Sequence, residues 1–431
     1  MNPVRSGYCR AFQMSFRAAL PVLPYREPEI LPRVEDVAGV LAKHKIASVL
    51  LVTDPGIAHL GLADRLVGSL RGAGIACAVF DKTHANPTIA DVEEAFGLYE
   101  EHKCRAIIGF GGGSSMDCAK GVGIRVARPR TPLSKMRGVL KVRHKLPLLI
   151  AVPTTAGTGS EVTLAAVITD GDRHYKYAIN DFNLIPRYAV HDYRLTVGLP
   201  PAITAQTGMD ALTHAVEAYI GRSTTAYTRR MAGEAVRLIH DNLLQAYEDG
   251  TDADARRNML TASYKAGIAF TQSYVGYVHG IAHSLGGQYG VPHGLANAVI
   301  LPHMLRAYGA SAQAPLARLA KLAGIAPEAA GDAIAAEAFI FWVDDMNRKM
   351  GIPRYIEGIR RADIPVMAAH CDAECNPLYP VPKLMDLVAL EHMYRVVAGE
   401  RFADDDEALQ DKRPAVDRAD ADRANADTKG E

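Results

Sequence analysis

The stretch Tyr277–His293, YVHGIAHSLGGQYGVPH, holds three histidines among small residues, and an aspartate and a further histidine precede it in the chain. Asp210 and His214 stand four positions apart in GMDALTHAVEAY, so on a helix both side chains point to one face. Neutral imidazoles with one carboxylate form a ligand set suited to Fe(II) or Zn(II), with a position left for solvent or substrate. These residues therefore predict a metal site.

The roles of His279, His283 and His293 stay open on spacing alone. His279 and His283 have the HxxxH spacing of a helical metal clamp, whereas His293 follows a glycine-rich segment. A single histidine is more often a core or surface residue than a ligand. One aspartate and several histidines within glycine- and alanine-rich helices are poorly explained by packing, because small neighbours leave room for a site.

A glycine-rich loop in GFGGGSSMDCAK has the composition of a phosphate-binding turn. Gly111, Gly112 and Gly113 follow an apolar strand, and Ser114 and Asp117 open the next helix. Glycines let the backbone approach a diphosphate, and the helix N-terminus offers unpaired N–H groups to it. The loop does not match GxGxxG, and a tight turn uses glycine for steric reasons as well, so the alternative is a purely structural turn.

A second loop, PTTAGTGSEVT, places Thr154, Thr155 and Thr158 after the strand LPLLIAVP. Open α/β sheets bind ligands beyond the carboxyl ends of their strands, so two such loops favour one shared ligand. Asp54 ends the strand SVLLVTD, where a carboxylate can bond both ribose hydroxyls and repel a 2′-phosphate. This favours NAD over NADP, and the alternative for Asp54 is a helix cap.

The elements that must position these residues fall into two halves. Over residues 46–199, short apolar β-branched runs alternate with helical stretches, which is typical of βαβ units and a parallel sheet. Over 200–401 the strand patterns stop, and long apolar-periodic segments predict helices. Gly198, Pro200 and Pro201 break both patterns, so we expect the boundary and a cleft there. Residues 1–45 form an extension to which we assign no role, and 402–431 is predicted to be disordered.

Composition limits the partners. The 48 basic and 48 acidic residues leave no net field that would attract nucleic acid or an anionic membrane. No apolar run reaches the roughly 20 residues that span a bilayer, and no clean signal sequence opens the chain, so we predict a cytoplasmic protein. The six scattered cysteines favour reduced thiols. Cys371 and Cys375 beside His370 would need a second ligand pair to form a structural zinc site.

Together, GGGSSMDCAK, PTTAGTGSEVT, GMDALTHAVEAY and HGIAHSLGGQYGVPHGLANA resemble the iron-containing (group III) alcohol dehydrogenases. The resemblance runs from about residue 46 to 400 and includes ANPT at 85–88 and NPLYPVPKLM near the C-terminus. It implies an α/β dinucleotide-binding domain of the dehydroquinate synthase type, followed by an all-helical metal-binding domain. It also implies a small alcohol or aldehyde as substrate, NAD, Fe(II) with Zn(II) as alternative, and a homo-oligomer, with a dimer expected first.

Matched motif by motif, the resemblance implies roles for single residues. His283 lies near the nicotinamide and would be the catalytic residue, relaying the hydroxyl proton. The implied metal ligands are Asp210, His214, His279 and His293. The implied cofactor-binding residues are Asp54 and Asn86 at the adenosine, Gly112, Gly113 and Ser114 at the diphosphate with Asp117 in the same helix, Thr154, Thr155 and Thr158, and Lys176 at the ribose or phosphates.

Departures from the family pattern leave the substrate open. Ser284 stands at the position of the proline in the sequence AHPLG, which is common in the family. Ala165 and Ala166 follow SEVT, where several relatives have bulkier or polar residues. These positions flank the expected substrate pocket. Phe270 is a candidate to form part of its wall.

Three other classes remain to be separated from a dehydrogenase. A lyase of the dehydroquinate synthase type would need a more cationic pocket, a metal hydrolase would not need nicotinamide, and a binding protein would only retain the cleft. Net NADH formation at 340 nm distinguishes the dehydrogenase from all three.

Overall fold

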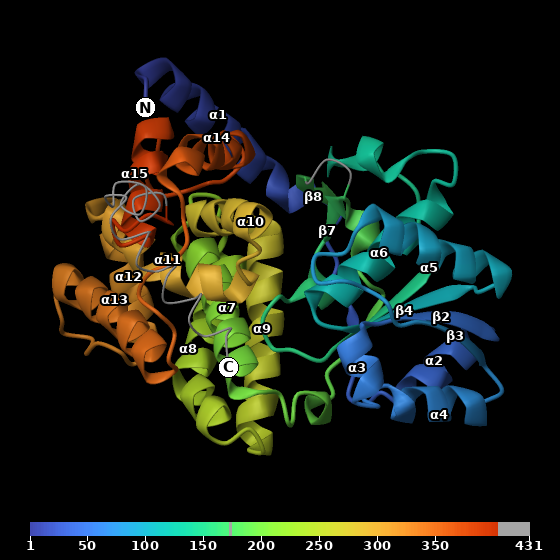
Figure 1. Ribbon diagram of the computed structural model, residues 1–431. Coiled ribbons are helices and arrows are strands. Elements are labelled where there is room, and N and C mark those ends of the chain that lie inside the picture. The colour runs from blue at the N-terminus through green and yellow to red at the C-terminus, as the bar shows by residue number, and fades with distance from the viewer. Residues whose placement is uncertain (172–174, 404–431) are drawn as a thin grey trace, which may run out of the picture.

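The chain forms two bodies that lie side by side, an α/β half and a helical half (Figure 1). The structure is a computed structural model that describes residues 1–171 and 175–403. The tail predicted over 402–431 lies outside the described residues except for its first two positions. The expected fold class, a parallel-sheet domain followed by an all-helical domain, is confirmed.

The α/β half is built on a six-stranded sheet in which every pairing is parallel. Its strands read as continuous apolar runs because both faces are covered, and β4 is buried along its whole length. In spatial order the strands are β1 (Glu29–Leu31), β9 (Tyr188–Val190), β6 (Leu148–Pro153), β4 (Ala106–Gly111), β2 (Ser48–Val52) and β3 (Ala76–Phe80).

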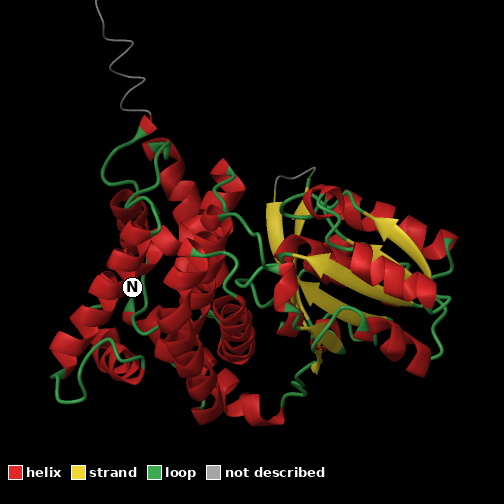
Figure 2. Cartoon of the chain, turned by 90° about the horizontal axis from the view of Figure 1, so that it is seen from below, coloured by secondary structure: helices red, strands yellow, loops and turns green. Residues whose placement is uncertain are grey.

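Helices cover both faces of this sheet (Figure 2). Two separate cores result, because α2 and α4 pack on one face and α5 and α6 on the other. The helices are α2 (Asp36–Lys43), α3 (Pro55–His59), α4 (Asp64–Gly72), α5 (Ile89–Glu101) and α6 (Gly113–Ala127).

A smaller sheet lies beside α6 and faces the helical half. β7 (Ala165–Asp170) and β8 (Tyr175–Asn180) pair antiparallel, and β5 (Gly138–Val139) runs parallel to β8. Short 3-10 turns complete this half at Leu133–Met136, Ser160–Val162, Phe182–Leu184 and Tyr193–Leu195.

The helical half is organised around α7 (Pro201–Ile220), which is buried at every residue from Gly208 to Ile220. Pro201 starts it, where the missing N–H of proline has no intrahelical partner to lose. None of the described helices is long and apolar enough to cross a membrane. The other helices are α8 (Ala226–Glu248), α9 (Ala253–Ser273), α10 (Tyr277–Tyr289), α11 (His293–Tyr308), α12 (Ala310–Leu322), α13 (Asp332–Lys349), α14 (Ile364–Cys375) and α15 (Leu387–Val397), with a 3-10 turn at Arg361–Asp363.

The first 45 residues connect the two halves. Helix α1 (Pro3–Ala19), followed by a 3-10 turn at Leu20–Val22, lies beside α14, where Arg5 pairs with Asp372 at 2.6 Å (Figure 1). The Gln13 amide donates to the Tyr379 carbonyl at 2.7 Å. Further along, β1 forms one edge of the large sheet and α2 packs on its face.

Candidate active site

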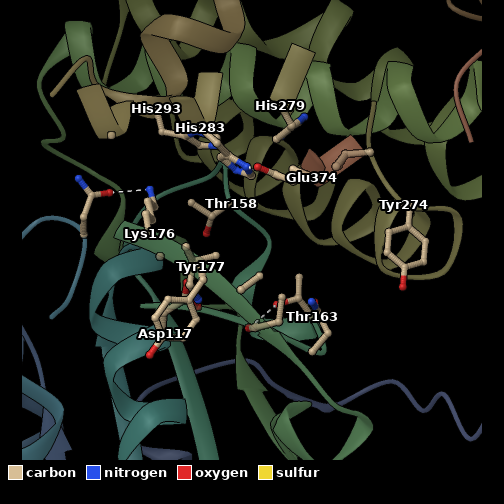
Figure 3. A pocket seen from close by; sticks show the side chains of 18 of the residues that line it. Asp117, Thr158, Thr163, Lys176, Tyr177, Tyr274, His279, His283, His293 and Glu374 are labelled. Carbon is tan, nitrogen blue, oxygen red and sulfur yellow. Dashed lines mark hydrogen bonds and ion pairs between the residues drawn. The ribbon is translucent and has the colours of Figure 1, made fainter. Parts of the chain in front are cut away.

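A cleft of about 1050 Å³ opens between the two halves, and both contribute to its wall. The predicted residues that line it are Asn86, Gly113, Ser114, Asp117, Thr158 and Lys176 from the α/β half, and Asp210, His214, His279, His283 and His293 from the helical half. The remaining predicted residues, Asp54, Gly112, Thr154 and Thr155, lie at the sheet edge outside this lining. Figure 3 shows the two groups facing each other across the cleft.

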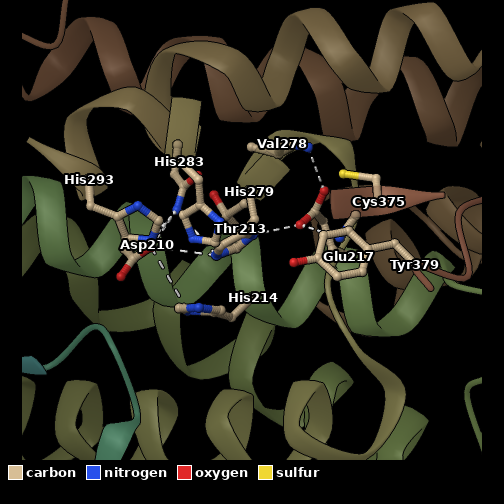
Figure 4. A network of polar contacts seen from close by, with 12 residues as sticks. Asp210, Thr213, His214, Glu217, Val278, His279, His283, His293, Cys375 and Tyr379 are labelled. Carbon is tan, nitrogen blue, oxygen red and sulfur yellow. Dashed lines mark hydrogen bonds and ion pairs between the residues drawn. The ribbon is translucent and has the colours of Figure 1, made fainter. Parts of the chain in front are cut away.

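Three helices bring the predicted metal ligands together (Figure 4). Asp210 and His214 lie one turn apart on α7, His279 lies in the first turn of α10, and His293 is the first residue of α11. The ligand atoms of Asp210, His279 and His293 all lie within 4.8 Å of one another.

His214 lies outside this group of three, but the distances from Asp210 to all three histidines are close to those around one metal ion. Asp210 Oδ1 lies 3.9 Å from His279 Nε2, 3.6 Å from His293 Nε2 and 3.9 Å from His214 Nδ1. Atoms bound at about 2.1 Å to one tetrahedral metal stand about 3.4 Å apart, so a small contraction would bring these atoms into range. His214 Nδ1 is buried without a hydrogen-bond partner, which a metal would supply. Burial lowers the pKa of all three histidines, so their lone pairs are available.

A carboxylate that sequence reasoning missed orients His279. Glu217, on the far side of that ring from Asp210, accepts from His279 Nδ1 at 2.6 Å and from the backbone N–H groups of Gly276 and Val278 (Figure 4). The bond fixes the tautomer and turns Nε2 towards Asp210. Burial raises the pKa of Glu217 to about 8. Its place in the apolar helix sequence THAVEAY was the available signal, since a buried glutamate there needs a partner.

Asn297 is the second residue that sequence reasoning missed at this cluster. It follows His293 by one turn, and its amide nitrogen lies 2.6 Å from Asp210 Oδ1 and 3.2 Å from both His279 Nε2 and His293 Nε2. The amide nitrogen therefore lies within hydrogen-bond distance of the same oxygen and nitrogen atoms that would bind a cation. Its oxygen is buried without a partner.

His283 points away from the metal cluster's carboxylate. Its Nδ1 lies 2.7 Å from Glu374 Oε1 on α14, and its ring stacks on His293 with centroids 5.2 Å apart. Glu374 also accepts from the Tyr379 hydroxyl at 2.7 Å. Glu374 is the third residue that sequence reasoning missed, because the motif HCDAEC was interpreted only through its cysteines, as a candidate zinc site. Those cysteines are buried with their sulfur atoms 3.8 Å apart.

The glycine loop takes the shape that a phosphate cradle needs. Gly111 has φ +148°, and a Cβ there would lie 2.5 Å from Ser115 Oγ, so a larger residue would strain the turn. Gly112 caps α6, whose first residues, Gly113 and Ser114, face the cleft. The positive end of α6 therefore points into the cleft.

Asp54 and Asp117 accept hydrogen bonds that stabilise the fold at the same sheet edge. Asp54 caps α3 by accepting from the Ile57 N–H at 3.0 Å, and its other oxygen accepts from Ser115 Oγ at 3.2 Å. This is the helix-cap role that the sequence left open.

Asp117 accepts from Ser160 Oγ and from the Val167 N–H, so it ties α6 to the second loop. Lys176 reaches across from β8 and donates to Asn86 Oδ1 at 2.7 Å (Figure 3).

Comparison with known proteins agrees with this geometry. Residues 32–193 match the family described as iron-containing alcohol dehydrogenase, and residues 204–393 match the Fe-containing alcohol dehydrogenase family, C-terminal. The 1,3-propanediol dehydrogenase of Klebsiella pneumoniae is 41% identical over 323 residues, 74% of this chain and 83% of that protein. The lactaldehyde reductase of Escherichia coli K12 is 36% identical over 349 residues, 80% of this chain and 91% of that protein.

Solved structures show the same relationship. A crystal structure of 1,3-propanediol oxidoreductase superposes with a TM-score of 0.82 at 35% identity, covering 86% of this chain and 99% of that one. The chain therefore belongs to the iron-containing alcohol dehydrogenase family. It is an oxidoreductase of the alcohol and aldehyde class, as the sequence motifs predicted.

Proposed function

We propose that this oxidoreductase interconverts a small alcohol and its aldehyde or ketone with NAD(H), and that Asp210, His214, His279 and His293 hold a divalent metal. Fe(II) is the metal expected first, and Zn(II) is the alternative. One observation carries the proposal: the mutually close ligand atoms, with the orphaned His214 Nδ1 beside them, open onto the same cleft as the N-terminus of α6.

The protein's own residues divide the work between the two halves. A bound metal would polarise the substrate oxygen, and a bound nicotinamide would exchange the hydride. The α6 N-terminus, with Thr158 and Lys176, would hold the dinucleotide in the cleft. Phe270, which stacks on His214 with centroids 4.1 Å apart, would form part of the wall at the substrate end, beside the metal cluster.

His283 is proposed to move the hydroxyl proton. Because its Nδ1 bonds to Glu374, its Nε2 is left to accept a proton from a substrate or ribose hydroxyl. The stacking of His283 on His293 supports this role, since it holds the ring beside the metal cluster without giving it a ligand position.

The cofactor and substrate follow from position and from the relatives. Asp54, at the carboxyl end of β2, favours NAD over NADP, because its charge repels a 2′-phosphate. Relatives named for 1,3-propanediol and lactaldehyde support a small substrate. We further propose a cytoplasmic enzyme that assembles as a homo-oligomer, with a dimer expected first, and sedimentation of the purified protein tests the assembly.

Absorbance at 340 nm tests the proposal. Protein loaded with Fe(II), or separately with Zn(II), should form NADH from small primary alcohols and should use NAD in preference to NADP. No NADH from a broad panel of alcohols, together with no NADH consumption with the matching aldehydes, would refute it.

A further inference from the structure

Glu374 is the carboxylate in the cleft that keeps an oxygen free. The described residues that line the cleft include three carboxylates, Asp117, Asp210 and Glu374. Asp117 has both oxygens bonded within the α/β half, and Asp210 belongs to the metal cluster. Glu374 is 35% exposed and takes both its hydrogen bonds on Oε1, so among the described residues Oε2 has no partner.

The fold holds this carboxylate in place. Gly280 lets α10 and α14 pack closely, because a Cβ there would lie 2.3 Å from Cys375 Sγ. On the other side, the Gln13 amide of α1 fixes the Tyr379 carbonyl, and the Tyr379 hydroxyl donates to Glu374. Figure 3 shows Glu374 reaching from this wall towards the histidines.

The group is anionic at neutral pH. Burial by itself would raise the pKa of Glu374, but the neighbouring His283, the Tyr379 hydroxyl and the charge of Lys176 outweigh it and place the pKa below its usual range. The cleft thus has a fixed negative charge one side chain away from the metal cluster, since His283 contacts both Glu374 and His293.

The lysine and arginine side chains among the described lining residues come from the opposite wall, although the charge of Lys176 also acts on Glu374. Lys176 and Arg137 come from the α/β half, and Lys176 Nζ is bonded to Asn86 Oδ1. A dinucleotide diphosphate held at the α6 N-terminus is attracted to this wall. Since Lys176 would then be shared with the diphosphate, the charge of Glu374 at the substrate end is only partly offset.

We propose that Glu374 selects substrates by charge, accepting neutral alcohols that carry a second hydroxyl group and rejecting hydroxy acids of the same length. A second hydroxyl can donate to Oε2, whereas a carboxylate in that place would face a like charge. The proposal rests on the proposed function, because it concerns the far end of the same substrate.

Two probes of equal length isolate the effect. Propane-1,3-diol and 3-hydroxypropanoate share the reacting carbinol and differ only in the terminal group. For metal-loaded wild-type protein, we expect kcat/KM to favour the diol by at least about 100-fold, and Glu374→Gln to reduce that preference at least about 10-fold. Glu357→Gln removes an exposed carboxylate on the surface and should leave the preference unchanged.

The preference ratio separates selectivity from damage to His283. Loss of the His283 contact would lower both rates together, whereas loss of the charge changes their ratio. An unchanged ratio in folded Glu374→Gln overturns the proposal, and Glu374→Ala takes its place if the glutamine variant does not fold.

Calorimetric binding of the two probes to the metal-loaded protein with NADH keeps the test independent of turnover. Weak acid binding that tightens at least about 10-fold in the variant supports the proposal even where no alcohol is oxidised, and that inactivity would refute only the proposed function. Equal binding of both probes by the wild type overturns the charge selection itself.

Discussion

The two walls of the cleft are built in different ways. The α/β wall presents backbone at the sheet edge: the turn after β4, the first N–H groups of α6 and the loop after β6 all follow directly from short contiguous motifs, and a few side chains such as Lys176 join them. The helical wall presents side chains from α7, α10 and α11, which are held by residues such as Glu217 and Asn297. A contiguous motif can specify the first kind of wall, whereas the second depends on how helices pack.

This difference predicts that metal binding and dinucleotide binding can be lost independently of each other. Changes in the helical wall should alter metal retention and leave dinucleotide binding intact, and changes in the glycine turn should do the reverse. Each variant below therefore needs both measurements.

The largest effect is expected from His279→Ala. Removing this buried ligand should abolish metal retention by elemental analysis and lower kcat/KM at least about 1000-fold, while NADH binding changes little. His283→Ala is the matched comparison, because it should retain the metal and lose rate. Complete metal loss in His283→Ala would reverse the roles assigned to the two histidines.

Glu217→Gln should weaken the helical wall without removing a ligand. We expect metal affinity, measured by competition with a chelator, to fall about 10- to 100-fold, because the His279 ring loses the carboxyl partner that fixes its tautomer and orientation. Glu248→Gln, an exposed change at the end of α8, is the control. Unchanged affinity in Glu217→Gln would show that packing alone orients His279.

Gly111→Ala tests the opposite wall. The φ of +148° and the 2.5 Å approach to Ser115 Oγ predict a strained turn, so the KM for NAD should rise several-fold and the free energy of unfolding should fall by about 1 to 3 kcal/mol. Metal content should stay at the wild-type value. Gly72→Ala in α4, with nothing within 4 Å of the added methyl group, should be neutral or stabilising. Metal loss in Gly111→Ala would contradict the separation of the two walls.

The smallest effect concerns the junction of the two halves. His191, after β9, packs edge-on against Tyr264 of α9, and burial lowers its pKa to about 4. The unfolded chain takes up a proton below about pH 6.5 while the folded chain does not, so stability is full above that pH and falls as the pH drops towards 4.

Urea unfolding of the metal-free protein at pH 7.5 and 5.5 measures this contribution. Other buried histidines add to the wild-type loss, so the comparison is with His191→Phe, which should lose about 1 kcal/mol less than the wild type. Equal losses in the two proteins would show that His191 is not kept neutral by burial.

Much of the fold was predictable because its signals are local. The alternation of apolar strands and helices gave the parallel sheet, and the apolar-periodic segments after Pro201 gave the helical half. The first 45 residues were not interpretable in this way, because α1 is stabilised by contacts such as Arg5 with Asp372, far away in the sequence.

The sequence by itself determined which residue types gather at the cleft, since the ligand-bearing motifs and the glycine loop lie within short segments. Only the tertiary structure decided how they are used. His279 and His283 have helical spacing for one shared metal, yet His279 Nε2 faces Asp210 and His283 Nδ1 faces Glu374. The physical reason is that an imidazole's role depends on what its other nitrogen bonds, and here those partners, Glu217 and Glu374, come from helices far apart in the chain.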